Sequence, residues 1–280
     1  MTLTLVLAIV LLPAPGVGDA IVEGPALSVS EVSVEGQHPE TLSLLGEPLY
    51  APPLSKEARA KADEDMRAAR AAYDKTPNAV PAIIALEQAH LLFGRLGDAI
   101  EILTHGLEAN ADDASLLLER GRNYIRLRKF EPAERDLRKA AETLPAANCA
   151  LAFAQFLTGA YPHAQATYAT CATPGIFAYL SARRAGATAA RPDVERLPPL
   201  EQEIHLPGSV SDKPAKGPPP LTASYFSAAE LLLEGKKDEA TKHLKEIVTK
   251  RRNEWMEPAY IAAEADYLKL YKPPKKKKKK

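Results

Sequence analysis

The side chains with the most reactive chemistry in this sequence are its histidines and cysteines. The histidines are His38, His90, His105, His163, His205 and His243. No two of them have the spacing of an H-E-x-x-H motif, so no zinc site of this type is predicted. His163 and Cys171 are eight residues apart in the sequence, which separates them by about 12 Å along one helix, too far for thiolate catalysis.

Motifs of hydrolases and nucleotide-binding enzymes are also missing from the sequence. It contains no G-x-S-x-G, Walker or G-x-G-x-x-G pattern. Two cysteines are too few for a disulfide-dense scaffold or a four-cysteine zinc site. We therefore expect a protein that is not an enzyme and that uses no metal or cofactor.

Cys149 and Cys171 suggest a structural role instead. They lie near the start of one expected helix and near the end of its antiparallel partner, two places that a helical hairpin brings together. In an exported protein a disulfide here would stabilise the hairpin by about 3 kcal/mol, because it restricts the unfolded chain. The alternative is two small buried thiols.

A change in composition at Ser55 indicates where the helices that position these residues begin. The chain before it is rich in Pro, Gly and Ser, and the chain after it is rich in Ala, Leu, Glu and Arg with helical periodicity. A repeat of 34 residues runs through this part. It relates Ile83, Leu96, Ala99 and Leu103 to Leu117, Phe130, Ala133 and Leu137, and it relates Ala72 to Gly106 and Ala140.

The clearest unit runs from Ala114 to Pro145. It carries Leu117, Gly121, Tyr124, Phe130, Ala133, Leu137, Ala140 and Pro145. This pattern resembles the tetratricopeptide repeat, a pair of antiparallel helices that stacks into a superhelix. Two further segments, 44–50 near the front and 260–266 near the end, look like an exported bacterial subgroup of these proteins without an assigned activity.

The resemblance implies an all-α solenoid of helix hairpins. We expect a signal peptide at 1–20, an extended segment at 21–54 and helical repeats at 55–190. A Pro-rich linker follows at 191–220, then a further repeat with a capping helix at 221–271 and a Lys-rich tail at 272–280. Alternating valines at 29, 32 and 34 predict one short strand in the extended segment.

In a stacked repeat the first helix of each pair lines the concave surface, so residues there are the default ligand contacts. By spacing these are Ile84, Gln88, Leu92, Leu118, Glu119, Arg122 and Arg126. The two arginines lie one turn apart and would hold a carboxylate; the simpler interpretation, which we favour, is that they are solvated and pair with Glu119. The Lys/Asn/Arg clamp of chaperone-binding relatives is missing, so the groove suits a partly apolar segment.

The first residues predict export. Positions 3–12 are apolar apart from Thr4 and are followed by Pro13, which makes the stretch too short to span a bilayer and typical of a signal peptide. No Lys or Arg precedes this stretch, so a retained anchor or a misassigned start remains the alternative. We expect a periplasmic or secreted protein.

The charge of the chain is divided between its body and its tail. The chain has 36 basic and 36 acidic residues, but residues 272–280 hold seven lysines and no acid. Contact with a polyanion or a membrane surface is therefore expected only from the Lys275 to Lys280 region, and a solvated end is the alternative. No aromatic residue lies between the lysines, so specific nucleic-acid binding is not predicted.

These observations together predict a non-enzymatic scaffold that binds an unidentified protein or peptide in the bacterial cell envelope. The alternative is an adaptor whose lysine tail docks on anionic lipid or polymer while the repeats support it.

Overall fold

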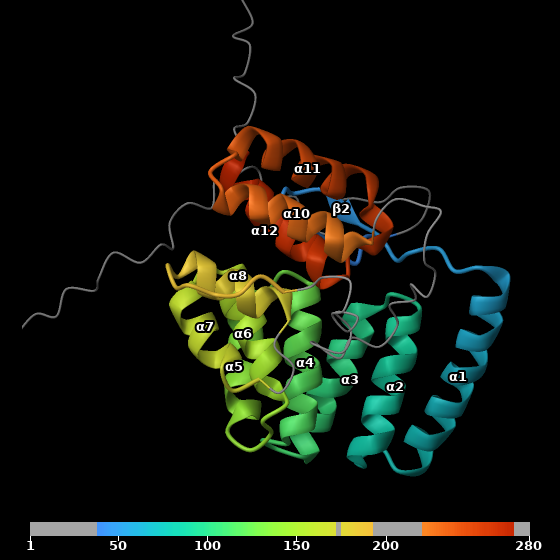
Figure 1. Ribbon diagram of the computed structural model, residues 1–280. Coiled ribbons are helices and arrows are strands. Elements are labelled where there is room, and N and C mark those ends of the chain that lie inside the picture. Colours follow the sequence, from blue (N-terminus) through green and yellow to red (C-terminus); the bar gives the residue numbers. More distant parts are fainter. Residues whose placement is uncertain (1–37, 172–174, 193–219, 272–280) are drawn as a thin grey trace, which may run out of the picture.

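The computed structural model describes residues 38–171, 175–192 and 220–271, and these form an all-α protein with one small β-hairpin (Figure 1). The all-α class is therefore as predicted, whereas the solenoid remains a prediction. The expected signal peptide, the three valines at 29–34, nearly all of the Pro-rich linker and the Lys-rich tail lie outside the described residues.

The described helices lie in two groups, one on each side of the Pro-rich segment 191–220. Before the linker they are α1 (Lys56–Lys75), α2 (Val80–Leu92), α3 (Leu96–Ala109), α4 (Ala114–Arg126), α5 (Phe130–Ala141), α6 (Ala147–Leu157), α7 (Tyr161–Tyr168) and α8 (Ile176–Arg184). After it come α10 (Leu221–Leu233), α11 (Lys237–Lys250), the short 3-10 helix η2 (Arg252–Glu254) and α12 (Pro258–Leu270). Side-chain caps begin two of these helices: Ser55 accepts from the N–H of Ala58 in α1, and Asp113 accepts from two N–H groups of α4.

The 34-residue repeat produces close helix pairs because small residues stand where two helices meet. At Gly121 on α4, a Cβ atom would lie 2.6 Å from Cγ of Leu137 on α5. At Gly106 on α3, it would lie 2.9 Å from the side chain of Ile83 on α2. Each helix from α1 to α8 packs against the next one in the chain.

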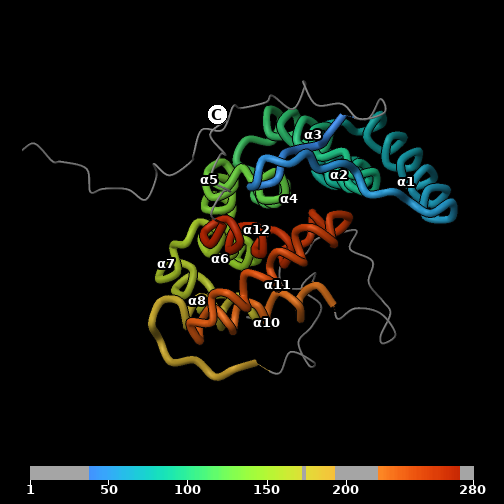
Figure 2. Tube along the Cα trace, turned by 90° about the horizontal axis from the view of Figure 1, so that it is seen from above, coloured from blue at the N-terminus to red at the C-terminus, as the bar shows by residue number. Residues whose placement is uncertain are grey.

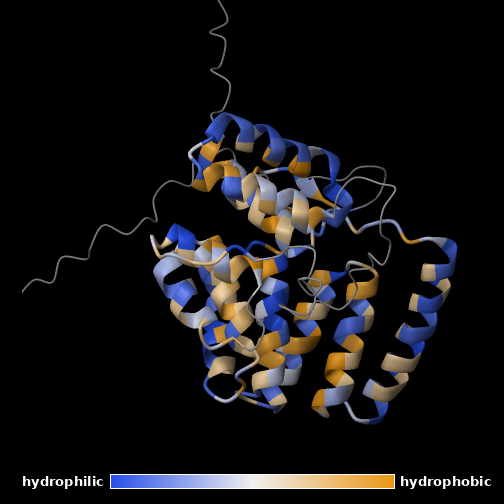
Figure 3. Cartoon of the chain, viewed as in Figure 1, coloured by the Kyte–Doolittle hydropathy of each residue, from blue (hydrophilic) through white to orange (hydrophobic). Residues whose placement is uncertain are grey.

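Seen from above, α1 to α8 follow one another around a bend, and α12 lies on its inner side (Figure 2). The last three helices pack on each other, and α12 also packs against α6. Figure 3 shows a hydrophilic outer side on α11, which agrees with its buried residues Ala240, Leu244, Ile247 and Val248 lying on one face. α12 is buried along nearly its whole length because helices cover it on both sides.

The segment before α1 forms a β-hairpin rather than a fully extended strap. Strands β1 (Thr41–Leu42) and β2 (Pro48–Leu49) pair in antiparallel fashion, with Thr41 opposite Leu49. The hairpin joins the two ends of the described chain, since the Trp255 indole donates to the carbonyl of Tyr50 at 2.7 Å and the Arg252 guanidinium pairs with Glu47.

Candidate functional site

The structure divides the predicted ligand contacts into two groups. The three from α2 are partly or fully accessible: Gln88 is exposed, and Ile84 and Leu92 are half-buried. The four from α4 are mostly enclosed, since Leu118, Arg122 and Arg126 are buried and Glu119 is nearly so. The four residues of α4 are therefore not open to a ligand in this structure, and the role of all seven residues in binding stays a prediction.

Two sets of equivalent residues describe this difference. We call Ala85, Gln88, Ala89 and Leu92 the α2 face. The residues 34 positions later, Glu119, Arg122, Asn123 and Arg126, are the α4 face. Because the repeat gives both helices the same place in their hairpins, the two faces are the same surface built with different side chains.

The α2 face borders an open groove between α1 and α2. The groove has a volume of about 450 Å³ and is lined by Asp65, Ala68, Ala69, Ala72, Ala85, Gln88, Ala89 and Leu92. Most of these residues are alanines. The surface of the groove is therefore largely apolar, and the small side chains leave its space open. Sequence spacing identified Gln88 and Leu92 but missed the contribution of α1, whose alanines looked like ordinary helix formers.

The α4 face is closed by the C-terminal helices. Only a cavity of about 10 Å³ remains between Arg122 and Arg126 on one side and Met256, Pro258 and Ile261 on the other. Arg122 is 6% exposed and Arg126 is 3% exposed. A free carboxylate therefore has no route to these two arginines in this structure, and the favoured interpretation of a solvated pair is also wrong.

The buried arginines take part in a network of polar side chains. Arg122 donates to Glu119 at 2.6 Å, as the sequence suggested for this pair. Arg126 donates to the amide oxygen of Asn123 at 2.5 Å, and the Asn123 amide nitrogen donates to Glu87 of α2 at 2.7 Å. The network thus holds α2 against α4 through Glu87, which is fully buried.

Burial dominates the electrostatics of this network. The pKa of Glu87 is raised to about 7, first by burial and then by the nearby charge of Glu119, while the hydrogen bond from Asn123 and the charges of Arg126 and Arg122 oppose this rise. Burial also lowers the pKa of both arginines. Among the described residues, one carboxylate oxygen of Glu87, one of Glu119 and Nε of Arg122 have no hydrogen-bond partner.

Two further ion pairs fix α12, and the sequence alone did not show them. Arg128 donates to Glu264 at 2.8 Å, and Arg184 makes two hydrogen bonds to Asp266, at 2.9 and 2.6 Å. All four side chains are at least nine-tenths buried. Glu264 and Asp266 belong to the 260–266 segment noted in the sequence, so its resemblance was the only available signal.

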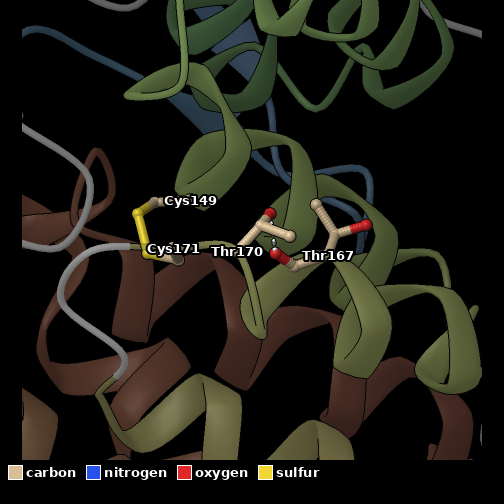
Figure 4. The surroundings of a disulfide bond; sticks show 4 residues. All are labelled: Cys149, Thr167, Thr170 and Cys171. Carbon is tan, nitrogen blue, oxygen red and sulfur yellow. Dashed lines mark hydrogen bonds between the residues drawn. A yellow bond between two sulfur atoms is a disulfide. The ribbon is translucent and has the colours of Figure 1, made fainter.

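Cys149 and Cys171 form a disulfide in the structure (Figure 4). Their Cα atoms are 5.2 Å apart, and the bridge joins the start of α6 to the chain just beyond α7. This is the hairpin position that sequence spacing indicated. In the sequence, both cysteines follow the residues of the α2 face and the α4 face.

Comparison with known proteins gives no further identification. No protein-family model matches the chain, no curated protein is significantly similar to it, and no solved structure matches it. Among the described residues, none of the helices combines the length and hydrophobicity required to cross a membrane.

Proposed function

We propose that the protein is a non-enzymatic scaffold of the tetratricopeptide type that binds a protein or peptide segment in the bacterial cell envelope. The observation that carries this proposal is the open groove beside the α2 face. The equivalent α4 face already holds a segment of the same chain, so this surface is suited to holding polypeptide. A repeat framework supplies a rigid support for such a surface.

The disulfide supports the proposed location in the cell envelope. Disulfides persist in oxidising compartments such as the periplasm, and the apolar stretch at 3–12 has the length of a signal peptide. Mass spectrometry of the protein from fractionated cells tests this. We expect a shortened, oxidised chain in the envelope fraction; a full-length, reduced chain in the cytoplasm would contradict it.

A photo-crosslinking amino acid at Gln88 tests the binding proposal directly. Gln88 is exposed and lines the groove, whereas Ala60 is exposed on α1 and does not line it. In intact cells we expect one dominant crosslinked product from position 88 and none from the matched control at position 60. Equal labelling from both positions, or none from either, would count against a partner in the groove.

The adaptor remains the second candidate, and one feature of the structure favours it. Leu268 and Tyr271 are 45% and 43% exposed at the end of α12, directly before the seven lysines of residues 272–280. Exposed apolar residues beside a basic segment suit an anionic membrane surface. Deletion of Lys275 to Lys280 should abolish sedimentation with phosphatidylglycerol vesicles at low salt; unchanged sedimentation would remove this candidate.

A further inference from the structure

The groove beside the α2 face is open because, among the described residues, no helix lies on α1 and α2 in the way that α2 lies on α3 and α4. From α1 it is lined by Asp65, Ala68, Ala69 and Ala72, whose counterparts 34 positions later on α3 are Ala99, Ile102, Leu103 and Gly106. On the α2 side, Ala85, Gln88 and Ala89 correspond to Glu119, Arg122 and Asn123 on α4. In that next repeat the counterpart surface is covered by α2: a Cβ atom at Gly106 would lie 2.9 Å from the side chain of Ile83, and Asn123, the counterpart of Ala89, donates to Glu87.

A second helix covers the α4 face from its other side. The residues that pack over Arg122 and Arg126 are Met256, Pro258 and Ile261, at the start of a helix. The stems of the arginines and these apolar side chains leave a cavity of only about 10 Å³. The groove beside the α2 face is lined by α1 and α2, and α12 does not line it.

We infer that the groove between α1 and α2 binds an amphipathic helix of a partner protein, with large apolar residues one turn apart facing the alanines. This rests on the proposed scaffold function and specifies the chemistry of its partner. The partner helix takes the place on α1 and α2 that α2 itself takes on α3 and α4.

The form of the groove favours a helix over an extended peptide. Its lining residues lie on two helices at spacings of three and four residues, which creates ridges into which the side chains of a third helix fit. An extended peptide gains most of its affinity by pairing with the edge of a sheet, and the groove walls are helices whose backbone groups are already bonded internally. Alanine walls also allow a close approach of the incoming helix.

The composition of the lining is consistent with this occupant. Asp65 is the single charged residue in the lining, and Lys61 already donates to it at 2.9 Å. An apolar stripe on the partner therefore meets a surface with little uncompensated charge.

Two peptide libraries of equal diversity, displayed on phage, test the inference with the full-length protein. One library presents variable residues on one face of a stable helix, and the other presents variable extended peptides. We expect binders from the helical library, with large apolar residues three or four positions apart. The best helical peptide is then labelled, and its affinity is measured by fluorescence anisotropy for the wild type and two variants.

The variants are Ala68→Ile, which copies Ile102 and fills the groove, and Ala60→Ile, which adds the same side chain to the exposed side of α1. Ala68→Ile should weaken binding at least tenfold and Ala60→Ile should leave it unchanged, with equal thermal melting for both. Equal weakening, or no weakening by Ala68→Ile, would overturn the site. Binders from the extended library alone would overturn the helix but leave the scaffold function standing, and no binder from either library would count against both.

Discussion

The α2 face and the α4 face occupy the same place in successive repeats, yet one is open and the other is part of the core. Gln88 is exposed, while its counterpart Arg122 is 6% exposed beneath the start of α12. The backbone repeat is the same in both, so the difference comes from the helices that lie on α4: α2 contacts Asn123 through Glu87, and the start of α12 covers Arg122 and Arg126. A repeat pattern therefore predicts which surface faces inward but not whether that surface is free.

The two faces also differ in their charged side chains. The α4 face carries two arginines, and a sequence-based argument treats such a pair as a solvated or anion-binding feature. In the fold Arg122 pairs with Glu119, and Arg126 donates to Asn123, which in turn donates to Glu87 in a largely buried site. Buried charges of this kind are tolerated only with partners, so the network and the position of α12 depend on each other.

The largest expected effect is a loss of stability, and it should be much larger for a change on the α4 face than for one on the α2 face. Arg122→Ala should lower the free energy of unfolding by about 3–5 kcal/mol, because it leaves the buried carboxylate of Glu119 without its partner at 2.6 Å. The matched change Gln88→Ala removes an exposed side chain and should alter stability by less than about 0.5 kcal/mol. Urea titration followed by circular dichroism measures both, and similar losses for the two variants would show that the faces do not differ as described.

The disulfide should have the next largest effect on stability. It should have little influence on either the α2 face or the α4 face. Its two cysteines are 22 residues apart in the sequence, and closing a loop of that size stabilises a protein by about 3 kcal/mol. Reduction, or the double change Cys149→Ala and Cys171→Ala, should lower the unfolding free energy by this amount. Crosslinking from Gln88 should persist, because the bridge joins α6 to the end of α7; its loss would link the bridge to the groove.

A third prediction uses the pH dependence of the buried network. The pKa of Glu87 is raised from 4.5 to about 7, so the folded state holds this proton more tightly than the unfolded state. The stabilisation is complete below about pH 4.5 and is lost as the pH rises through 7, with an upper bound of about 3 kcal/mol.

Glu87→Gln keeps the shape of the side chain and removes its titration. We expect this variant to lose less stability than the wild type between pH 5 and pH 8, while Glu101→Gln, at an exposed site on α3, keeps the wild-type profile. Parallel profiles for the wild type and Glu87→Gln would show that Glu87 titrates normally.

Much of the fold was accessible from the sequence because it depends on local spacing. The 34-residue step places Gly121 against Leu137 and Gly106 against Ile83, and the composition change at Ser55 marks the start of the helices. The closure of the α4 face was not accessible, because it depends on Met256, Pro258 and Ile261, more than 130 residues away in the chain. The β-hairpin at 41–49 was missed for a similar reason, since long-range contacts to Trp255 and Arg252 hold it in place.

The smallest expected effect on stability should accompany a clear effect on binding. The double change Gln88→Arg and Leu92→Arg gives the α2 face both arginines of the α4 face, but without the cover of α12. Gln88 is exposed and Leu92 is half-buried, so the new side chains extend into solvent, and the unfolding free energy should change by no more than about 1 kcal/mol. Because the charges occupy the mouth of an apolar groove, affinity for an apolar helical peptide should fall at least tenfold, as anisotropy measures. An unchanged affinity in a folded variant would show that the difference between the two faces does not control binding.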